Sequence, residues 1–244
     1  MTLGAHDLTL AGRLSDVSLS LCAGEVTAIC GPNGAGKSSL LSCLAGILAP
    51  QSGKAVLDDR PLADLPPRDR ARAIGYLPQQ GEVAWDLSVE SLAGLGRLPW
   101  DAGIEADRAA VEAALAALEL DALRLRRASA LSGGERARAL LARVLAGEPR
   151  WLLADEPLAN LDLAHQLALL ARLRALAGQG AGVVLVMHDL AQVMNHADRV
   201  VVLDRGRVAA DGPPETALSE AVIERVWKVS ARWLGDAGQR ALLV

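Results

Sequence analysis

An apolar segment, Val26–Cys30, runs directly into a glycine-rich loop, and a segment with helical character begins at Lys37. Residues 31–38 read Gly-Pro-Asn-Gly-Ala-Gly-Lys-Ser, which fits the pattern G-x-x-x-x-G-K-[ST]. Glycines let a backbone curl round a phosphate chain with its N–H groups pointing inward, and the following helix adds unpaired N–H groups and the positive end of its dipole. The feature therefore demands a buried strand, a tight loop and a helix in succession.

The side chains of this loop predict a nucleotide site. Lys37 supplies a mobile positive charge for β- and γ-phosphates, and the Ser38 hydroxyl can ligate magnesium. Apart from Lys37 the chain's lysines are Lys54 and Lys228, and arginine supplies the other basic side chains. The candidate nucleotide ligands are Gly31, Pro32, Asn33, Gly34, Ala35, Gly36, Lys37, Ser38 and Ser39.

Composition and charge exclude several classes of protein. A chain of 244 residues with 51% hydrophobic residues suits one large α/β domain, or such a domain with a small lobe, and is not disordered. The net charge of −4 offers no broad basic surface, so we expect no nucleic-acid partner. The sequence shows neither a signal peptide nor an apolar run of about 20 residues that would span a membrane. Cys22, Cys30 and Cys43 lack C-x-x-C spacing and are expected to be core residues in a reducing cytoplasm.

The order of segments predicts an α/β fold with a helical insertion. Short strands are expected at 8–10, 17–21, 25–30, 55–57 and 73–77, with helices at 37–47 and 67–73. From 81 to 147 the pattern predicts helices alone, at 89–94, 105–120 and 134–146. Beyond this come strands at 151–154, 182–187 and 199–203, separated by helices at 162–176 and 190–196. Apolar strands that alternate with helices imply a parallel sheet buried on both faces.

A second motif, Trp151–Pro157, places two acidic side chains after an apolar strand. Asp155 and Glu156 then lie at the carboxyl edge of the sheet, where the glycine-rich loop also emerges and where open α/β sheets bind ligands. We expect Asp155 to hold magnesium through its waters and Glu156 to polarise the attacking water as general base.

A third motif, Leu131–Glu135, precedes the helix that begins near Gly134. Ser132 can simply cap that helix. Alternatively, the small residues admit close backbone approach and make a second phosphate-binding helix end. Two such ends with one set of catalytic residues point to a site shared between two subunits.

These motifs, together with Asn160-Leu161-Asp162 and Val186–Asp189, resemble the ATP-binding cassette (ABC) ATPases over essentially the whole chain. The resemblance implies a homodimer that binds ATP and Mg²⁺, each nucleotide lying between the loop of one copy and the signature segment of the other. The signature residues would be Ser132, Gly133, Gly134 and Glu135. Gln79, with Gln80 as the alternative, would sense the γ-phosphate and magnesium; Asp162 would cross the dimer and His188 would reach the γ-phosphate.

The resemblance also implies an architecture. We expect a P-loop NTPase of the ABC type forming a single domain over 1–244, with a mixed, mostly parallel sheet and an N-terminal antiparallel β subdomain. Its core would comprise 1–80 and 148–212, with a helical signature subdomain at 81–147. A C-terminal helix and strand, 213–244, carry no motif.

Three segments, at 71–79, 94–100 and 197–212, look most like the ATPases of iron-chelate, haem and cobalamin importers. That type works with a separate transmembrane permease, expected as two subunits, and indirectly with a periplasmic or surface substrate-binding protein. The chain would then sit at the cytoplasmic face of the inner membrane. Trp85 and Trp100 are candidate permease contacts, with core packing as the equal alternative.

Other roles within the superfamily remain as alternatives. A DNA-repair or chromosome-organising ATPase would insert a long coiled coil between Gln79 and Ser132, but 52 residues without sustained heptads lie there. A translation-factor type would carry two cassettes. An importer ATPase for another cargo and a soluble ATPase of iron–sulfur cluster assembly both stay open.

Two departures from the family pattern concern the edges of the site. Leu8–Leu14 holds no aromatic residue to stack on adenine, so an aliphatic side chain or Arg13 would support the base. Ala137 stands where the family usually has glutamine, which affects the edge of the shared site more than its centre.

We predict that Lys37→Ala abolishes nucleotide binding or turnover, because the phosphate loop loses its ammonium. ATPase activity should fall at least about 100-fold, measured as phosphate release, with Lys54→Ala as the control. Unchanged activity would refute the phosphate-loop assignment.

Overall fold

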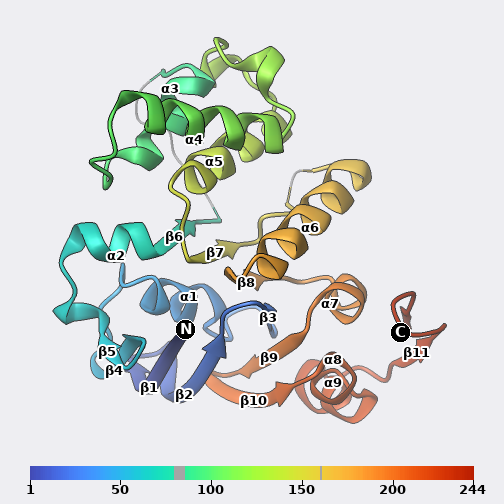
Figure 1. The fold of residues 1–244 in the computed structure, drawn as a ribbon. Helices are drawn as coiled ribbons and strands as arrows, with labels where there is room; N and C mark the ends of the chain where they lie inside the picture. The colour runs from blue at the N-terminus through green and yellow to red at the C-terminus, as the bar shows by residue number, and fades with distance from the viewer. Residues whose placement is uncertain (80–85, 160) are drawn as a thin grey trace.

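The computed structural model spans residues 1–244 and describes all of them except 80–85 and 160. Its centre is a six-stranded sheet in the order β10-β9-β3-β8-β7-β6 (Figure 1). The five strands from β9 to β6 are parallel, and β10 is antiparallel at the edge. The strands are β3 Val26–Cys30, β6 Ile74–Leu77, β7 Trp151–Asp155, β8 Gly182–Val186, β9 Arg199–Asp204 and β10 Arg207–Gly212.

A second, antiparallel sheet is built by the N-terminal strands in the order β2-β1-β4-β5. These strands are β1 Thr2–Leu10, β2 Leu14–Cys22, β4 Ser52–Leu57 and β5 Arg60–Pro61. The helix α1, Lys37–Leu44, lies between the two sheets, and its Leu40, Leu41 and Leu44 are fully buried. The β3 side chain that faces this layer is Ile29, while Val26, Ala28 and Cys30 face the other layer, as the period of two in a strand requires.

Helices cover the opposite face of the parallel sheet. α6, Leu163–Gly178, and α7, Leu190–His196, lie directly on it. The helices α3 Val89–Gly94, α4 Ile104–Ala117 and α5 Gly133–Ala146 form a lobe, called here the helical lobe, that stands at the top of Figure 1. The remaining elements are α2 Pro67–Ala73, α8 Pro214–Ala217, α9 Glu220–Trp227, β11 Arg232–Leu234 and β12 Ala241–Leu243.

Most elements agree with the expected ones, and the exceptions have local causes. The helix expected to reach Ile47 ends at Leu44, because Gly46 takes a left-handed φ of 68°. The sequence pattern does not predict β10, because this edge strand buries no residue completely and lacks an apolar pattern. Cys30 and Cys43 are buried as expected, but Cys22 is exposed, so its assignment to the core was wrong. Cys22 lies on the outward side of β2, whose side chains alternate between buried and exposed.

An indole ring joins the helical lobe to the core. The guanidinium groups of Arg97 and Arg72 both lie over the Trp100 ring, with their Cζ atoms 4.8 and 5.2 Å from its centroid. Its Nε1 donates to the Gly147 carbonyl at 2.9 Å. Arg97 is 6% exposed and pairs with Asp107 and Glu148. Trp100 thus packs within the molecule, one of its two expected roles, while Trp85 lies outside the described residues.

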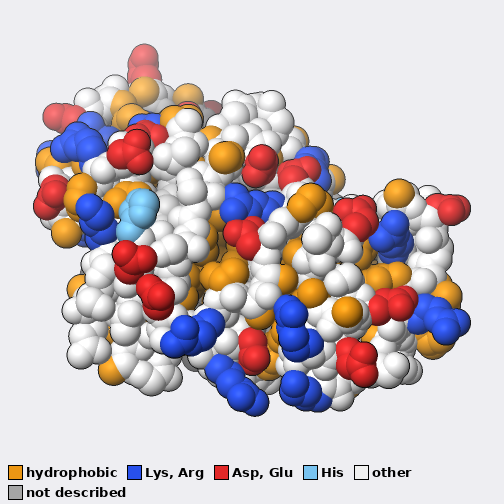
Figure 2. Space-filling view, turned by 90° about the horizontal axis from the view of Figure 1, so that it is seen from below, with side chains coloured by type: hydrophobic (Ala, Val, Ile, Leu, Met, Phe, Trp, Pro, Cys, Tyr) orange, Lys and Arg blue, Asp and Glu red, His pale blue; other side chains and the backbone are white. Residues whose placement is uncertain are grey.

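The surface carries both signs of charge. Figure 2 shows acidic and basic side chains interspersed over the face turned to the bottom of Figure 1, with apolar side chains near the middle.

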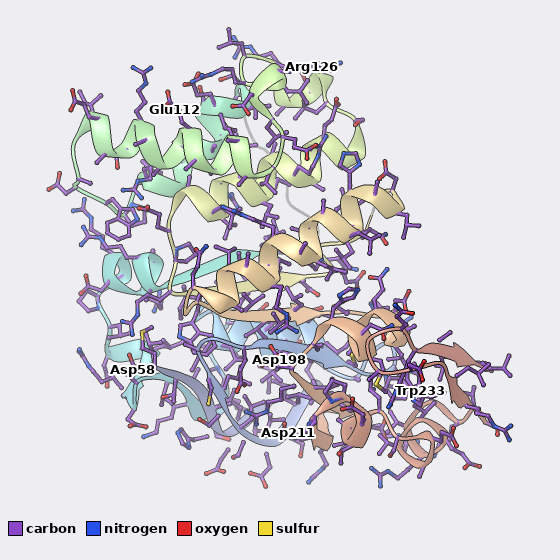
Figure 3. The ribbon with its side chains drawn as sticks, turned by 45° about the vertical axis from the view of Figure 1, so that its right-hand side comes forward. Asp58, Glu112, Arg126, Asp198, Asp211 and Trp233 are labelled. Carbon is purple, nitrogen blue, oxygen red and sulfur yellow. The ribbon has the colours of Figure 1, made fainter. Side chains whose placement is uncertain are left out.

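Two acidic side chains hydrogen-bond to strands of the core. Asp211 accepts a hydrogen bond from Arg199 at 2.7 Å, and Asp198 accepts one from the Val26 N–H at 2.8 Å (both acids are labelled in Figure 3). Within the described part of the chain, no helix is both long and apolar enough to cross a bilayer.

We predict that Gly182→Ala destabilises the protein, because Gly182 is the register partner of Trp151 on β7 and the indole covers it. An added Cβ would meet carbon atoms of that ring inside van der Waals distance. The free energy of unfolding should fall by about 1–3 kcal/mol in denaturant titration. The control is Gly178→Ala at the end of α6, where a Cβ meets nothing within 4 Å. An equal loss in both variants would contradict the packing argument.

Candidate active site

The carboxyl ends of three adjacent strands bring the predicted catalytic residues together. β8 lies between β3 and β7, and its Val186 is the register partner of both Ile29 and Asp155. The residues that follow each strand therefore leave the sheet side by side: the glycine-rich loop after β3, His188 after β8 and Glu156 after β7. This is the edge at which open parallel sheets bind ligands.

The glycine-rich loop closes on its own lysine. Gly34 and Gly36 have φ values of 78° and 100°, which favour glycine, and let the chain turn tightly into α1. The Lys37 ammonium donates to the carbonyls of Gly31 at 2.9 Å and Pro32 at 3.0 Å. Burial lowers the pKa of Lys37, while Cys30, Glu156 and Asp155 act in the opposite sense.

The start of α1 suits an anion. The helix has no side-chain cap and no acidic residue in its first turn, so its N–H groups and dipole meet no competing negative charge there. Arg13, one of the two expected supports for adenine, lies beside this turn with Nη1 3.4 Å from the Ser39 hydroxyl. Gly36 packs against the Arg13 carbonyl, which fixes the β1–β2 turn against the loop.

Asp155 ends β7 as a buried carboxylate that is only partly satisfied. Its side chain is 3% exposed, and among the described residues Oδ1 has no hydrogen-bond partner. Burial raises the pKa of Asp155; the nearby Ser38 hydroxyl acts against this, and the Glu156 charge adds to it. An orphaned carboxylate oxygen beside a serine hydroxyl is a donor set that fits Mg²⁺. No cluster of three His, Cys, Asp or Glu that could bind a metal occurs among the described residues, and Mg²⁺ usually takes one or two protein ligands and completes its shell with phosphates and water.

Glu156 and His188 form a direct pair. His188 Nε2 lies 2.5 Å from Glu156 Oε1, and the two side chains are 44% and 20% exposed. Glu156 has a left-handed φ of 53°, held by its N–H donating to the Val186 carbonyl at 3.1 Å. The pair lines a cavity of about 280 Å³, which leaves room for a ligand beside the carboxylate. Gln79 is exposed two residues beyond Leu77, the β6 partner of Ala154, so it emerges at the same edge. The alternative, Gln80, lies outside the described residues.

The signature segment stands apart from this edge. Ser132 caps α5 by accepting from the Glu135 N–H at 3.3 Å, and its own N–H donates to Glu135 Oε2 at 2.7 Å. The backbone hydrogen bond from Ser132 lowers the pKa of Glu135. This capping box does not use the N–H groups of Gly133 and Gly134. Segment 132–135 belongs to the helical lobe (Figure 1), and in the described part of the chain no hydrogen bond or ion pair joins it to the loop.

Asp162 is also separate from the catalytic pair. It caps α6 by accepting from the His165 N–H at 2.9 Å, and the hydrogen bonds with His165 lower its pKa. Its side chain is 66% exposed. Asn160 lies outside the described residues. One chain thus gathers the loop, Asp155, Glu156, His188 and Gln79, but not Ser132–Glu135 or Asp162.

Two glutamines that line the cavity beside Glu156 carry no signal in the sequence. Gln192 of α7 donates to the Gln166 side chain at 3.0 Å, and Gln166 of α6 donates to the carbonyls of Leu158 and Leu161. Both line the cavity of Glu156 and His188. They tie the helix after His188 to the segment after Glu156. No motif spacing marks them, because their contact joins residues 26 positions apart.

The fold and this strand-edge loop define the class of P-loop NTPases. A family model described as ABC transporter matches residues 14–159. The hemin import ATP-binding protein HmuV of Nocardia farcinica is 46% identical over 217 residues, covering 88% of this chain and 75% of the relative. The protein of the same name from Bordetella pertussis is 43% identical over 248 residues, covering 95% and 94%.

Solved structures agree. The dimeric ATP-binding cassette MJ0796, in a post-hydrolysis state with ADP and Pi, has a TM-score of 0.81 at 26% identity, covering 87% of this chain and 98% of that one. The cbiO1 subunit of Clostridium perfringens, part of the transporter complex cbiONQ, has a TM-score of 0.78 at 29% identity, covering 91% and 92%. The chain belongs to the ABC transporter family. It is an ABC-type ATPase that binds ATP, which confirms the resemblance seen in the motifs.

We predict that Asp155→Asn stabilises the protein while removing turnover. The Asp155 pKa is raised on folding, so folding disfavours its ionised form, and a neutral amide escapes that penalty. The free energy of unfolding at pH 7 should rise, whereas Mg²⁺-dependent ATPase should be lost. The same change at exposed Asp101 is the control. A less stable Asp155→Asn protein would show that the carboxylate is not strained.

Proposed function

We propose that this chain is the ATPase subunit of an importer for haem or a related iron chelate. The observation that carries the catalytic part is the meeting of the glycine-rich loop, Asp155 and the Glu156–His188 pair at one sheet edge. The cargo class rests on the relatives named as hemin import ATP-binding proteins, which are 43–46% identical to this chain.

Each residue at the edge has a role that its position suits. Backbone N–H groups of residues 31–38 and the Lys37 ammonium bind the phosphates. Ser38 and Asp155, with Gln79, hold Mg²⁺, which when bound stabilises charge on the phosphate oxygens. Glu156 accepts a proton from the attacking water, and His188, bonded to Glu156, orients it and reaches the γ-phosphate. Arg13 beside Ser39 supports the base.

The separation of the signature segment from the loop supports a shared site. In our proposal Ser132–Glu135 and Asp162 of one copy meet the loop of a second copy across ATP, with the free N–H groups of Gly133 and Gly134 facing phosphate. ATP then binds the closed pair better than the open one, and hydrolysis removes the γ-phosphate that makes the difference. Closure would do mechanical work on a separate pair of permease subunits at the cytoplasmic face of the inner membrane, fed by a substrate-binding protein.

We predict that Glu156→Gln binds ATP but turns it over at least about 100-fold more slowly. Because the γ-phosphate then persists, the variant should run as a dimer on size exclusion with ATP and Mg²⁺. The matched control is Glu215→Gln at an exposed position of α8. A variant that stays monomeric would contradict the shared site.

The cargo is tested through the partner. The tagged chain, purified from detergent-solubilised membranes, should retain a permease, and the complex in liposomes should hydrolyse ATP faster when haem-loaded binding protein is enclosed. Stimulation by another chelate but not by haem would show that the cargo is that chelate and not haem. Recovery with soluble partners alone would favour the iron–sulfur assembly alternative.

A further inference from the structure

The last 17 residues, which follow α9, fold back onto the core as a hairpin. β11 and β12 pair antiparallel, with Trp233 opposite Leu242. The Trp233 indole donates to the Leu218 carbonyl at 2.7 Å, and its backbone N–H donates to Glu220 Oε1 at 3.2 Å (Trp233 is labelled in Figure 3). The hairpin is therefore anchored to the α8–α9 region and does not trail as a free tail.

The same hairpin is bound to α7 by two hydrogen bonds between the Asn195 side-chain amide and the Arg240 backbone. Asn195 Nδ2 donates to the Arg240 carbonyl at 2.8 Å, and the Arg240 N–H donates to Asn195 Oδ1 at 2.8 Å. The Asn195 amide therefore provides hydrogen bonds to both the N–H and the carbonyl of Arg240, as a neighbouring β-strand would. Asn195 Nδ2 also donates to the Ala191 carbonyl one turn earlier, so its rotamer is locked.

α7 links this contact to the catalytic edge. The helix has seven residues, too few to be stable alone, so its position depends on the elements that pack against it. Asp189 caps its start, and the residue before the cap is His188. A groove of about 500 Å³ lies between His188 and Asp189 on one side and the hairpin residues Leu242 and Val244 on the other.

We infer that the C-terminal hairpin positions His188, with Asn195 as the residue that transmits the constraint through α7. Gln192 secures α7 on the side of the catalytic cavity, and Asn195 lies outside the set of residues that line that cavity. The inference rests on the proposed role of His188. The ATPase rate should be sensitive to the placement of His188 beside Glu156, because a shift of about 1 Å in a catalytic group costs up to roughly 100-fold in rate.

The test is a double-mutant cycle in ATPase rate under single turnover. Asn195→Ala should lower the rate about tenfold or more, with the affinity for ATP within about twofold of the wild type, because the phosphate loop is untouched. The rate of Asn195→Asp should lie between those of the wild type and Asn195→Ala, because its carboxylate still accepts a hydrogen bond from the Arg240 N–H. Gln239→Ala, an exposed amide in the same hairpin, is the matched control and should retain the wild-type rate.

The His188→Ala background separates positioning from general support. If Asn195 acts through His188, Asn195→Ala should add little to the loss that His188→Ala already causes. An equal additional loss in that background, or a wild-type rate for Asn195→Ala alone, would overturn the inference. A wild-type rate for His188→Ala would instead overturn the proposed role of the histidine. Removal of 231–244 provides the second variant, and the same rate defect with unchanged ATP affinity supports positioning by the hairpin.

Discussion

The parallel register of β3, β8 and β7 is the constraint on which the site depends. Hydrogen bonds along these strands set Ile29, Val186 and Asp155 level, so that the loops leaving the three strands begin at one edge of the sheet. A shift of one residue in β8 would turn Val186 to the other face and move His188 away from Glu156. The register of β7 against β8 is fixed by shape at Gly182, because the Trp151 indole covers this position and leaves no room there for a side chain.

Charge at this edge is held at a cost. Lys37 and Asp155 are 7% and 3% exposed, and burial shifts the pKa of each toward its neutral form. Neither is fully neutralised by the protein: the ammonium rests on carbonyls, and one carboxylate oxygen lacks a partner among the described residues. The fold thus keeps opposite charges near each other but not in contact, which suits a ligand that bears phosphates and a metal ion.

The sequence predicted which candidate residues meet in space where those residues directly follow a strand. The loop, Asp155, Glu156 and His188 each follow an apolar run, and a parallel sheet must bring such positions together. It did not predict contacts made by single side chains across long separations, such as Gln192 with Gln166 or Asn195 with Arg240. The hairpin edge strand β10 was missed for a related reason: it pairs through its backbone with β9, and its side chains carry no burial pattern.

The contact between the Lys37 ammonium and the carbonyls of its own loop has a consequence for the nucleotide binding that we propose there. The lysine's conformational freedom is already lost within the folded loop, so binding exchanges one set of acceptors for another and orders little new structure. A ligand displaces the two carbonyls from the Lys37 ammonium only if it carries more negative charge than they do. Under the proposed function, this preorganisation would make binding at the loop depend on the phosphates and their negative charge more than on the nucleoside.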